Sequence, residues 1–312
     1  MVVFLFPGQG SQFPGMAKDL YEKYESVKAL FHKADDACGR DMKALLFDGS
    51  ADDLKETENA QPAIVLASLA AREALLAEGF ASGGAAGHSL GEYSAMVDAG
   101  VLTPEDALRA VTARGELMAA AGAQITSEKG DIGMAAVIGI GPEAVSKALE
   151  GQNDVWSANE NGPAQVAIGG TKAGMDAAAE ALKAAGARRI IPLKVSCPFH
   201  TPLMAGPAEL MKAVLADITF SNPVKSVWSN VSASVVKSGD EARSLLVQQV
   251  THPVRWVDLM ASIAESSPSA LYEAGPGKVL AGLWSKSGQN GTCFPAGTVG
   301  DLDTIKENKQ ES

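Results

Sequence analysis

Residues 83–91 read Gly-Gly-Ala-Ala-Gly-His-Ser-Leu-Gly, and the last five form a G-x-S-x-G pentapeptide around Ser89. Between a strand and a helix, this pattern builds a sharp bend whose glycines leave room for the backbone and whose serine hydroxyl points outward. Leu90–Val97 predicts the helix that follows. The small residues of 81–86 indicate a strand only weakly. A glycine-rich turn with an incidental serine is therefore the competing interpretation.

Working outward from this stretch, short apolar strands alternate with helical segments, which indicates an α/β fold. Val2–Phe6 predicts a buried strand. Gln61–Glu78 predicts a helix, with Asn59 as its cap and Pro62 in its first turn. A further helix is predicted over Thr103–Ala121, because it begins with a capping residue followed by proline and two acids.

The middle of the chain predicts the order β-α-β-β-α-β, which is the ferredoxin-like pattern. We interpret it as a small domain, residues 126–197, inserted into a larger domain made of residues 1–125 and 198–312. The predicted strands are Ile132–Ile138, Val155–Asn159, Gln165–Ile168 and Arg189–Val195, and the predicted helices are Pro142–Leu149 and Thr171–Ala185.

After the insert, the larger domain resumes with alternating elements. Helices are predicted over 203–215, 241–249, 256–264 and 278–285, and strands over 224–228, 271–274 and 293–299. The polar residues Glu307–Ser312 are expected to lack regular structure.

The composition is that of a soluble globular protein, with 46% hydrophobic and 20% charged residues in 312. The net charge of −11 argues against non-specific binding to nucleic acid, so no nucleic-acid partner is expected. No uninterrupted apolar run approaches the roughly 18 residues of a membrane span, so no membrane partner is expected. The cysteines, Cys38, Cys197 and Cys293, lack metal-site spacing. We therefore expect a reduced, cytoplasmic protein without a metal.

A reactive serine needs a base, and the chain has four histidines. His88 adjoins Ser89, so its side chain should point away. His32 lies on an amphipathic helix, and His252 precedes a proline. His200 follows the small domain, where clefts form between domains, and is the best candidate. A buried structural histidine is the alternative interpretation for any one of them.

An acid that would orient the base is harder to find. Asp217, Asp240 and Asp258 all have ordinary helix-end or surface explanations. Cys197 lies near His200 but is not predicted to be the nucleophile, because it is Ser89 that lies on the predicted sharp bend.

Several short motifs occur in order along nearly the whole chain. They are Phe6-Pro-Gly-Gln-Gly-Ser-Gln12, Gly87-His-Ser-Leu-Gly-Glu-Tyr93, Arg114-Gly-Glu-Leu-Met118, Asn159–Gln165, Pro198-Phe-His200 and Gln249–Pro253. This set resembles the malonyl-coenzyme A:acyl carrier protein transacylases of bacterial fatty-acid synthesis. The resemblance implies a hydrolase-like parallel-sheet domain with a ferredoxin-like insert. It also implies malonyl transfer from malonyl-CoA to the phosphopantetheine thiol of an acyl carrier protein, through a malonyl-serine ester and without a cofactor.

The resemblance assigns a role to each matching residue. Ser89 would be the nucleophile and His200 its base, oriented by a main-chain carbonyl near Gln249. The backbone N–H groups of Gln9 and Leu90 would stabilise the oxyanion. Orientation by a carbonyl explains why no acid suggests itself, and it avoids a second negative charge beside the malonyl carboxylate.

Three further positions concern the substrate. Arg114 would clamp the malonyl carboxylate, because a guanidinium pairs bidentately with it; a surface arginine is the alternative. Phe199 would limit the substituent on the substrate, favouring malonyl over methylmalonyl. Asn159 and Asn161 match a segment near the coenzyme channel, or else build the turn at residues 161–163.

Positive charge collects in the second half of the small domain, whose sequence contains five basic and two acidic residues. They are Lys172, Lys183, Arg188, Arg189 and Lys194 against Asp176 and Glu180. One hypothesis is that this basic face docks the acidic carrier. The other is ordinary solvated helix charge.

Two other classes of function remain open. A serine esterase or thioesterase would share the bend and the base but needs no carboxylate clamp. A nucleotide-binding module is weakly suggested by Gly8-Gln-Gly10, but Phe13 stands where that fingerprint needs glycine. The stretch Gly275-Pro-Gly-Lys278 lacks the spacing and hydroxyl residue of a phosphate loop.

Overall fold

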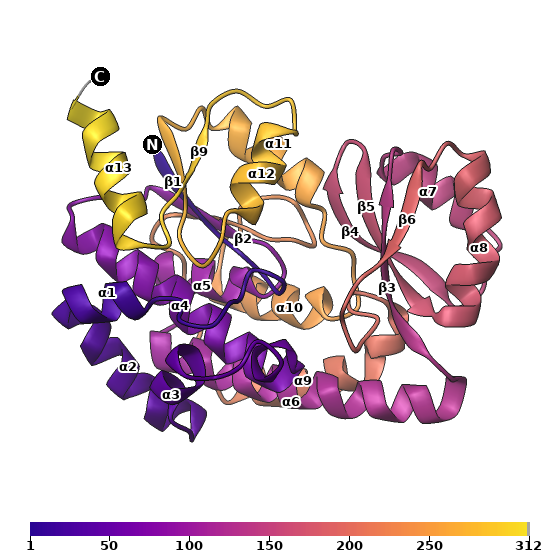
Figure 1. Ribbon diagram of the computed structural model, residues 1–312, viewed down its shortest axis with the longest axis horizontal. Coiled ribbons are helices and arrows are strands. Elements are labelled where there is room, and N and C mark those ends of the chain that lie inside the picture. Colours follow the sequence, from indigo (N-terminus) through magenta and orange to yellow (C-terminus); the bar gives the residue numbers. More distant parts are fainter. Residues whose placement is uncertain (311–312) are drawn as a thin grey trace.

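The computed structural model describes residues 1–310, which form two lobes built on separate sheets (Figure 1). The larger lobe contains a five-stranded sheet in the order β7-β2-β1-β8-β9. All its neighbouring strands are parallel. The strands are β1 (Val2–Phe6), β2 (Gly84–Gly87), β7 (Ser226–Trp228), β8 (Ala270–Glu273) and β9 (Cys293–Pro295).

Helices cover both faces of this sheet, and strand β1 is therefore buried on both sides. Val3 and Leu5 pack with α11 and α12, whereas Phe4 and Phe6 face the larger helical layer. The first group is α11 (Trp256–Glu265) and α12 (Val279–Ser285). The larger layer includes α1 (Lys18–Lys23), α2 (Glu25–Cys38), α3 (Met42–Phe47), α4 (Thr57–Ala77), α5 (Gly91–Asp98), α6 (Pro104–Lys129), α9 (Ala205–Ala216), α10 (Gly239–Gln249) and α13 (Val299–Gln310).

The smaller lobe has the predicted ferredoxin-like order, with antiparallel strands in the sequence β4-β5-β3-β6. Its elements are β3 (Ile132–Ile138), α7 (Pro142–Leu149), β4 (Val155–Gly162), β5 (Gln165–Thr171), α8 (Lys172–Ala184) and β6 (Arg189–Pro192). Helix α6 continues past residue 125, so the chain enters the smaller sheet only after Lys129. Strand β6 ends at Pro192, earlier than predicted. The fold class predicted from the sequence is confirmed.

The start of α4 was predicted wrongly. The helix begins at Thr57, so Asn59 and Pro62 both lie inside it. Pro62 has no N–H with which to bond the Glu58 carbonyl. Arg40 replaces that donor, because its Nη2 lies 2.7 Å from the Glu58 oxygen and its Nη1 2.6 Å from Asn59 Oδ1.

Helix α4 is also long and apolar enough to cross a membrane by length and composition, with a mean hydropathy of 1.3 over its best window. The prediction from uninterrupted apolar runs did not detect it. However, 78% of that window is buried inside the protein. The helix therefore has the composition expected of a core element.

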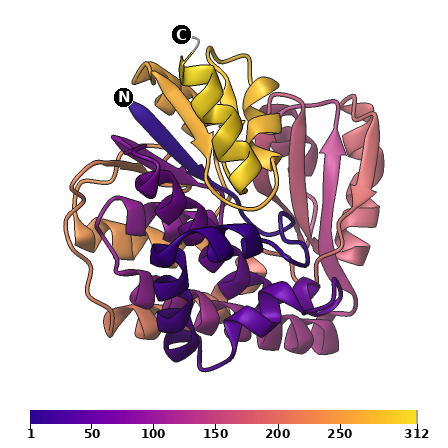
Figure 2. The same ribbon diagram turned by 60° about the vertical axis from the view of Figure 1, so that its left-hand side comes forward.

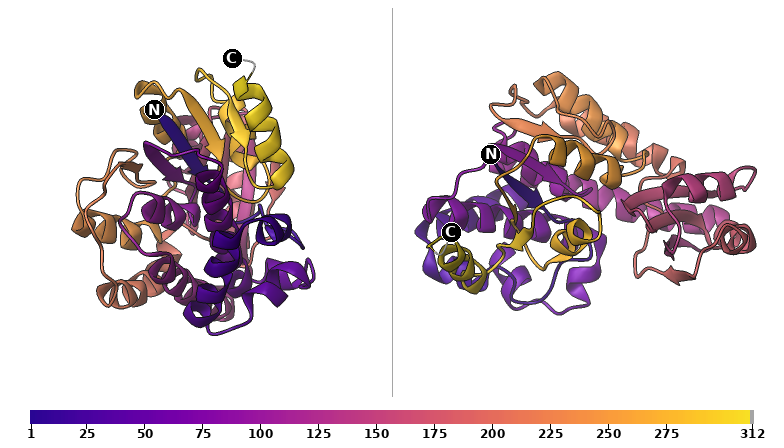
Figure 3. Two further views of the ribbon diagram at one scale, coloured as in Figure 1. Left: turned by 90° about the vertical axis from the view of Figure 1, so that its left-hand side faces the viewer. Right: turned by 90° about the horizontal axis from the view of Figure 1, so that it is seen from above.

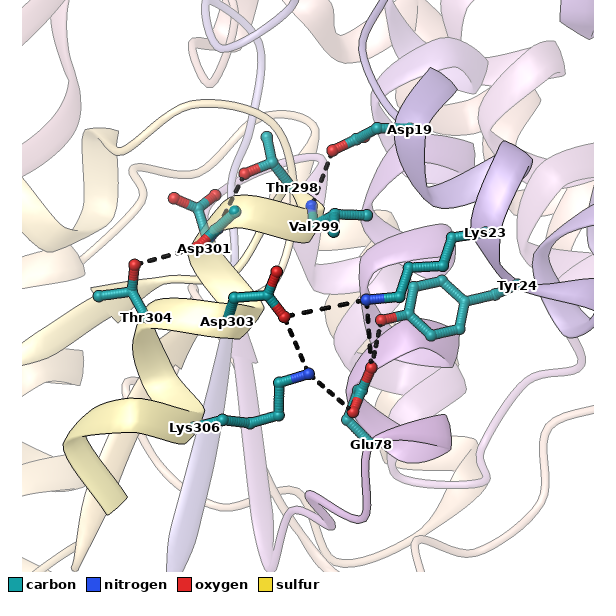
Figure 4. Close-up of polar contacts among 11 residues, drawn as sticks. Asp19, Lys23, Tyr24, Glu78, Thr298, Val299, Asp301, Asp303, Thr304 and Lys306 are labelled. Carbon is teal, nitrogen blue, oxygen red and sulfur yellow. Dashed lines mark hydrogen bonds and ion pairs between the residues drawn. The ribbon is translucent and has the colours of Figure 1, made fainter. Parts of the chain in front are cut away.

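Helix α13 was not predicted, and Glu307–Gln310, expected to lack regular structure, belong to it; residues 311–312 lie outside the described part. Polar contacts tie its first turns to α1 and α4 (Figure 4). Lys306 pairs with Glu78, which also accepts a 2.6 Å hydrogen bond from Tyr24. Asp19 accepts a bond from the Val299 N–H. These tertiary contacts stabilise a helix that has only a weak apolar face of its own.

The two lobes meet beside the carboxyl ends of the central strands. Viewed from above, the smaller lobe projects to one side of the larger (Figure 3). In Figure 2, β1 points from the N-terminus toward the side of the molecule on which the smaller lobe lies. Backbone bonds join the lobes, because Glu160 N–H donates to Val254 O and Val254 N–H donates to Ala158 O. Carboxyl ends of parallel strands are where α/β proteins place ligand sites.

Candidate active site

Ser89 lies on the sharp bend that the pentapeptide predicts, between β2 and α5, with a left-handed φ of 50°. Both flanking glycines are required for this bend. A Cβ on Gly87 would lie 2.0 Å from the Gly91 backbone, and one on Gly91 would lie 2.1 Å from Phe6 O. Gly8 is equally confined, since its Cβ would approach His88 O to 2.5 Å. The segment is therefore the tightly packed strand-to-helix bend that the pentapeptide predicts.

His200 is the histidine that meets Ser89, with 2.6 Å between Nε2 and Oγ. It comes from the segment that follows the smaller lobe, and it too has a left-handed φ, of 60°. The imidazole is almost completely buried. The hydroxyl and the ring are therefore in hydrogen-bond contact, as general-base catalysis requires.

A main-chain carbonyl holds the other side of the ring. His200 Nδ1 lies 2.7 Å from Gln249 O. Gln249 is the last residue of α10, so its carbonyl has no intrahelical partner and points out of the negative end of the helix. A carbonyl can only accept, so Nδ1 carries the proton and Nε2 is free to accept one from Ser89.

The other candidates for the base and for the orienting acid do not lie beside Ser89. His32, His252 and the three aspartates Asp217, Asp240 and Asp258 are exposed. His88 turns away from the hydroxyl, as expected, and its Nε2 lies 2.7 Å from Asn161 Oδ1. Asn161 lies within β4 and the turn falls after it, so the simple turn-building role is wrong.

Arg114 is buried in the same site, with only 2% of its surface exposed, and the surface-arginine alternative is wrong. Its Nη1 donates to Gln61 Oε1 at 2.8 Å and its Nη2 to Gln249 Oε1 at 3.2 Å. Both acceptors are neutral amides, and no ion pair to Arg114 occurs among residues 1–310. Its Nε has no hydrogen-bond partner there. The site thus holds a buried cation with no direct ion pair among the described residues.

Two backbone N–H groups are available near Ser89. In the described part of the chain, neither Gln9 N–H nor Leu90 N–H has a hydrogen-bond acceptor. The N–H of Ser89 itself is occupied, because Asn230 Oδ1 accepts from it at 2.6 Å. Unused donors beside a reactive hydroxyl have the character of an oxyanion hole.

A cavity of about 140 Å³ joins these groups. Every predicted site residue except Gln249 lines it: Gln9, Ser89, Leu90, Arg114, Asn159, Asn161, Phe199 and His200. A second cavity of about 160 Å³ shares Gln9, His88 and Asn161 with the first. It provides a direction from which a long substrate could reach Ser89.

Three contributing residues were not predicted. Gln61 holds Arg114, but it lies far away in the sequence on α4. Asn230 binds the bend, accepting from Ser89 N–H and donating to Gly87 O at 2.6 Å. Glu92 is buried and lies within the quoted motif around Ser89. Its position in the first turn of α5, directly after the bend, is the sequence signal that could have revealed it.

The structure also argues against the phosphate-loop interpretation of residues 275–278. The first N–H groups of α12 are already bonded to the carboxylate of Glu273, at 3.0 Å from Leu280 and 2.8 Å from Ala281. A carboxylate in this position excludes a phosphate from the helix N-terminus.

Comparison with known proteins agrees with this geometry. The chain is an acyl transferase by family, since the family model "Acyl transferase domain" matches residues 3–303. The chain is 42% identical over 289 residues to the malonyl CoA-acyl carrier protein transacylase of Bacillus subtilis (strain 168), covering 91% of this chain and 90% of that one. It is 42% identical over 284 residues to the Escherichia coli (strain K12) protein of the same name, covering 90% of each.

Solved structures give the same result. The malonyl-transacylase of Streptococcus pneumoniae superposes with a TM-score of 0.93 at 35% identity, covering 99% of this chain and 100% of that one. A malonyl-transacylase in complex with its type II PKS acyl-carrier protein gives 0.91 at 38% identity, covering 98% and 99%. The chain belongs to the family of malonyl CoA-acyl carrier protein transacylases.

We predict that the reactivity of Ser89 persists well below neutral pH. Burial, reinforced by the charge of Arg114, lowers the pKa of His200 to about 3. A lowered pKa keeps the imidazole neutral, and thus basic, as pH falls through the ordinary histidine range. Modification of Ser89 by phenylmethylsulfonyl fluoride, measured by mass spectrometry, should therefore be nearly constant from about pH 7 to about pH 5. A loss of half the rate near the ordinary histidine pKa of 6.5 would contradict this.

Proposed function

We propose that this chain transfers a malonyl group from malonyl-coenzyme A to the phosphopantetheine thiol of an acyl carrier protein, through a malonyl ester on Ser89. The observation that carries this proposal is Arg114, a buried guanidinium held by neutral amides in the cavity of Ser89 and His200. A carboxylate is the group that such a cation binds best. The names of the relatives and the carrier-bound structural neighbour support the same reaction.

The first half-reaction forms the ester. Ser89 Oγ attacks the thioester carbonyl while His200 Nε2 takes its proton, and Gln9 and Leu90 N–H groups donate to the oxyanion. The carbon–sulfur bond then breaks, and the leaving sulfur receives the proton from His200. In the second half, the carrier thiol gives its proton to His200, its sulfur attacks the ester, and Ser89 regains its hydrogen.

The remaining residues act on the substrate. Arg114 grips the malonyl carboxylate, which holds the ester in one orientation. Phe199 closes the cavity beside His200 and limits the α-substituent. Asn159 and Asn161 line the route of the coenzyme A arm, which the second cavity extends. No cofactor or metal takes part. The buried free thiols of Cys38, Cys197 and Cys293 suit the reducing cytoplasm.

An esterase or thioesterase would use the same serine and histidine, but it has no need of a buried cation. Substitution of Arg114 by alanine should therefore separate the functions. We expect malonyl transfer to the carrier to fall by about 100-fold or more, because a charge-assisted pair is lost. Acetyl transfer should persist or improve, since acetyl has no carboxylate.

The matched control is Arg109→Ala, on the same helix but exposed, which should leave both transfers unchanged. The measurement is transfer of each acyl group from coenzyme A to carrier protein, with release of coenzyme A in the absence of carrier as the hydrolysis control. Equal loss of malonyl and acetyl transfer in Arg114→Ala would contradict the clamp.

The carrier docks on the basic face of the smaller lobe. Lys172 and Lys183 are paired with Asp176 and Glu180 on α8, so their charges are largely compensated. Arg188 and Arg189 are exposed and form no ion pair among the described residues. They line a groove of about 700 Å³ that shares Leu193 with the catalytic cavity. An acidic carrier would complement them there.

We predict that the double substitution Arg188→Glu and Arg189→Glu raises the Michaelis constant for the carrier and leaves the constant for malonyl-CoA unchanged. The control is Lys172→Glu and Lys183→Glu, which should have a smaller effect. Steady-state kinetics with varied carrier measure both. An unchanged constant for the carrier would end the docking hypothesis.

A further inference from the structure

Glu92 is a buried carboxyl that the reaction above does not use. Its side chain is completely shielded from solvent on the first turn of α5. Oε2 accepts from Gln249 Nε2 at 2.5 Å and from Asn230 N–H at 3.3 Å. Oε1 has no hydrogen-bond partner within residues 1–310. A buried oxygen without a donor makes the ionised form costly.

One amide connects this carboxyl to the other functional groups. Gln249 Nε2 donates to both Glu92 and Ser89 O, whereas Gln249 Oε1 accepts from Arg114. The main-chain oxygen of the same residue holds His200. Glu92 and Arg114 are thus the two charges of one buried cluster, and they influence each other through a low-polarity interior.

Glu92 is the group in this cluster whose charge can change near neutral pH. Burial raises its pKa to about 7. The hydrogen bond from Gln249 opposes that rise most, followed by Ser229, Asn230 and the positive charge of Arg114. The other titratable neighbours do not compete: the pKa of Tyr93 is raised to about 12, and that of His200 is lowered to about 3. The groups that face Glu92 are Tyr93 on α5, Arg114 on α6, Gln249 on α10, Ser229 and Asn230 after β7, and His200 beyond them.

We infer that the malonyl group is bound together with one proton, which Glu92 takes up when the malonyl carboxylate pairs with Arg114. The inference rests on the proposed function, because it takes Arg114 as the carboxylate site. Pairing with malonyl cancels the positive charge that favours ionised Glu92, and it adds a second carboxylate to the same buried cluster. Protonation from solvent leaves one guanidinium facing one anion. An acetyl group has no carboxylate, so its binding should not be accompanied by uptake of a proton on Glu92.

The test is calorimetric binding to Ser89→Ala, which cannot be acylated. Titration with malonyl-CoA and with acetyl-CoA, in buffers of different ionisation enthalpy, gives the protons taken up per ligand. The two ligands share the same phosphates, so their difference isolates the acyl group. Uptake with malonyl-CoA should grow from about pH 6 toward one proton at about pH 8. Over the same range its Kd should rise ever more steeply, approaching about tenfold per pH unit where one full proton is taken up.

Glu92→Gln in the same background should abolish both the uptake and the pH dependence, because glutamine is neutral yet still accepts from Gln249. The control Glu273→Gln changes another buried carboxyl, which lines neither the catalytic cavity nor the second cavity, and should retain both. Malonyl-CoA that binds more tightly than acetyl-CoA but without differential uptake would overturn this inference alone. Equal affinities of the two ligands, also unchanged by Arg114→Ala, would overturn the clamp and with it the proposed function. The comparison of malonyl-CoA with acetyl-CoA in Ser89→Ala tests the inference even if Glu92→Gln does not fold.

Discussion

The 2.6 Å contact between Ser89 and His200 joins two residues that both have left-handed backbones. A side-chain-bearing residue adopts this conformation only when the surroundings enforce it. At Ser89 the enforcement comes from two glycines that fit against Phe6 and the start of α5, and from Asn230, which bonds both sides of the bend. The presentation of the hydroxyl therefore depends on the parallel sheet, and the rest of the site is arranged around that point.

Neutral groups, rather than charged ones, hold both the histidine and the arginine of the site. A carbonyl at the end of α10, rather than an aspartate, orients His200, and amides rather than carboxylates hold Arg114. An anionic substrate group thus finds a cation that is not already paired. Among the described residues, Glu92 is the carboxyl hydrogen-bonded to Gln249, and its raised pKa fits a group that can give up its charge.

Much of this could be predicted from the sequence, because the decisive signals are local. The pentapeptide defined the bend, strand and helix periodicity gave both lobes, and the ordered motifs identified Ser89, His200 and Arg114. The errors have tertiary causes. Arg40 permits Pro62 inside α4, and ion pairs to Glu78 stabilise the polar helix α13. Gln61 and Asn230 act from distant elements whose contacts no local pattern encodes.

The central claim is that an acyl group is carried on Ser89, and the intact mass of the protein after brief mixing with malonyl-CoA tests it most directly. The account predicts a mass increase of one malonyl group, located on Ser89 by peptide mapping, lost on addition of carrier protein and absent from Ser89→Ala. A malonyl adduct that survives in Ser89→Ala, or transfer to the carrier with no adduct on the wild-type chain under rapid quench, would contradict it.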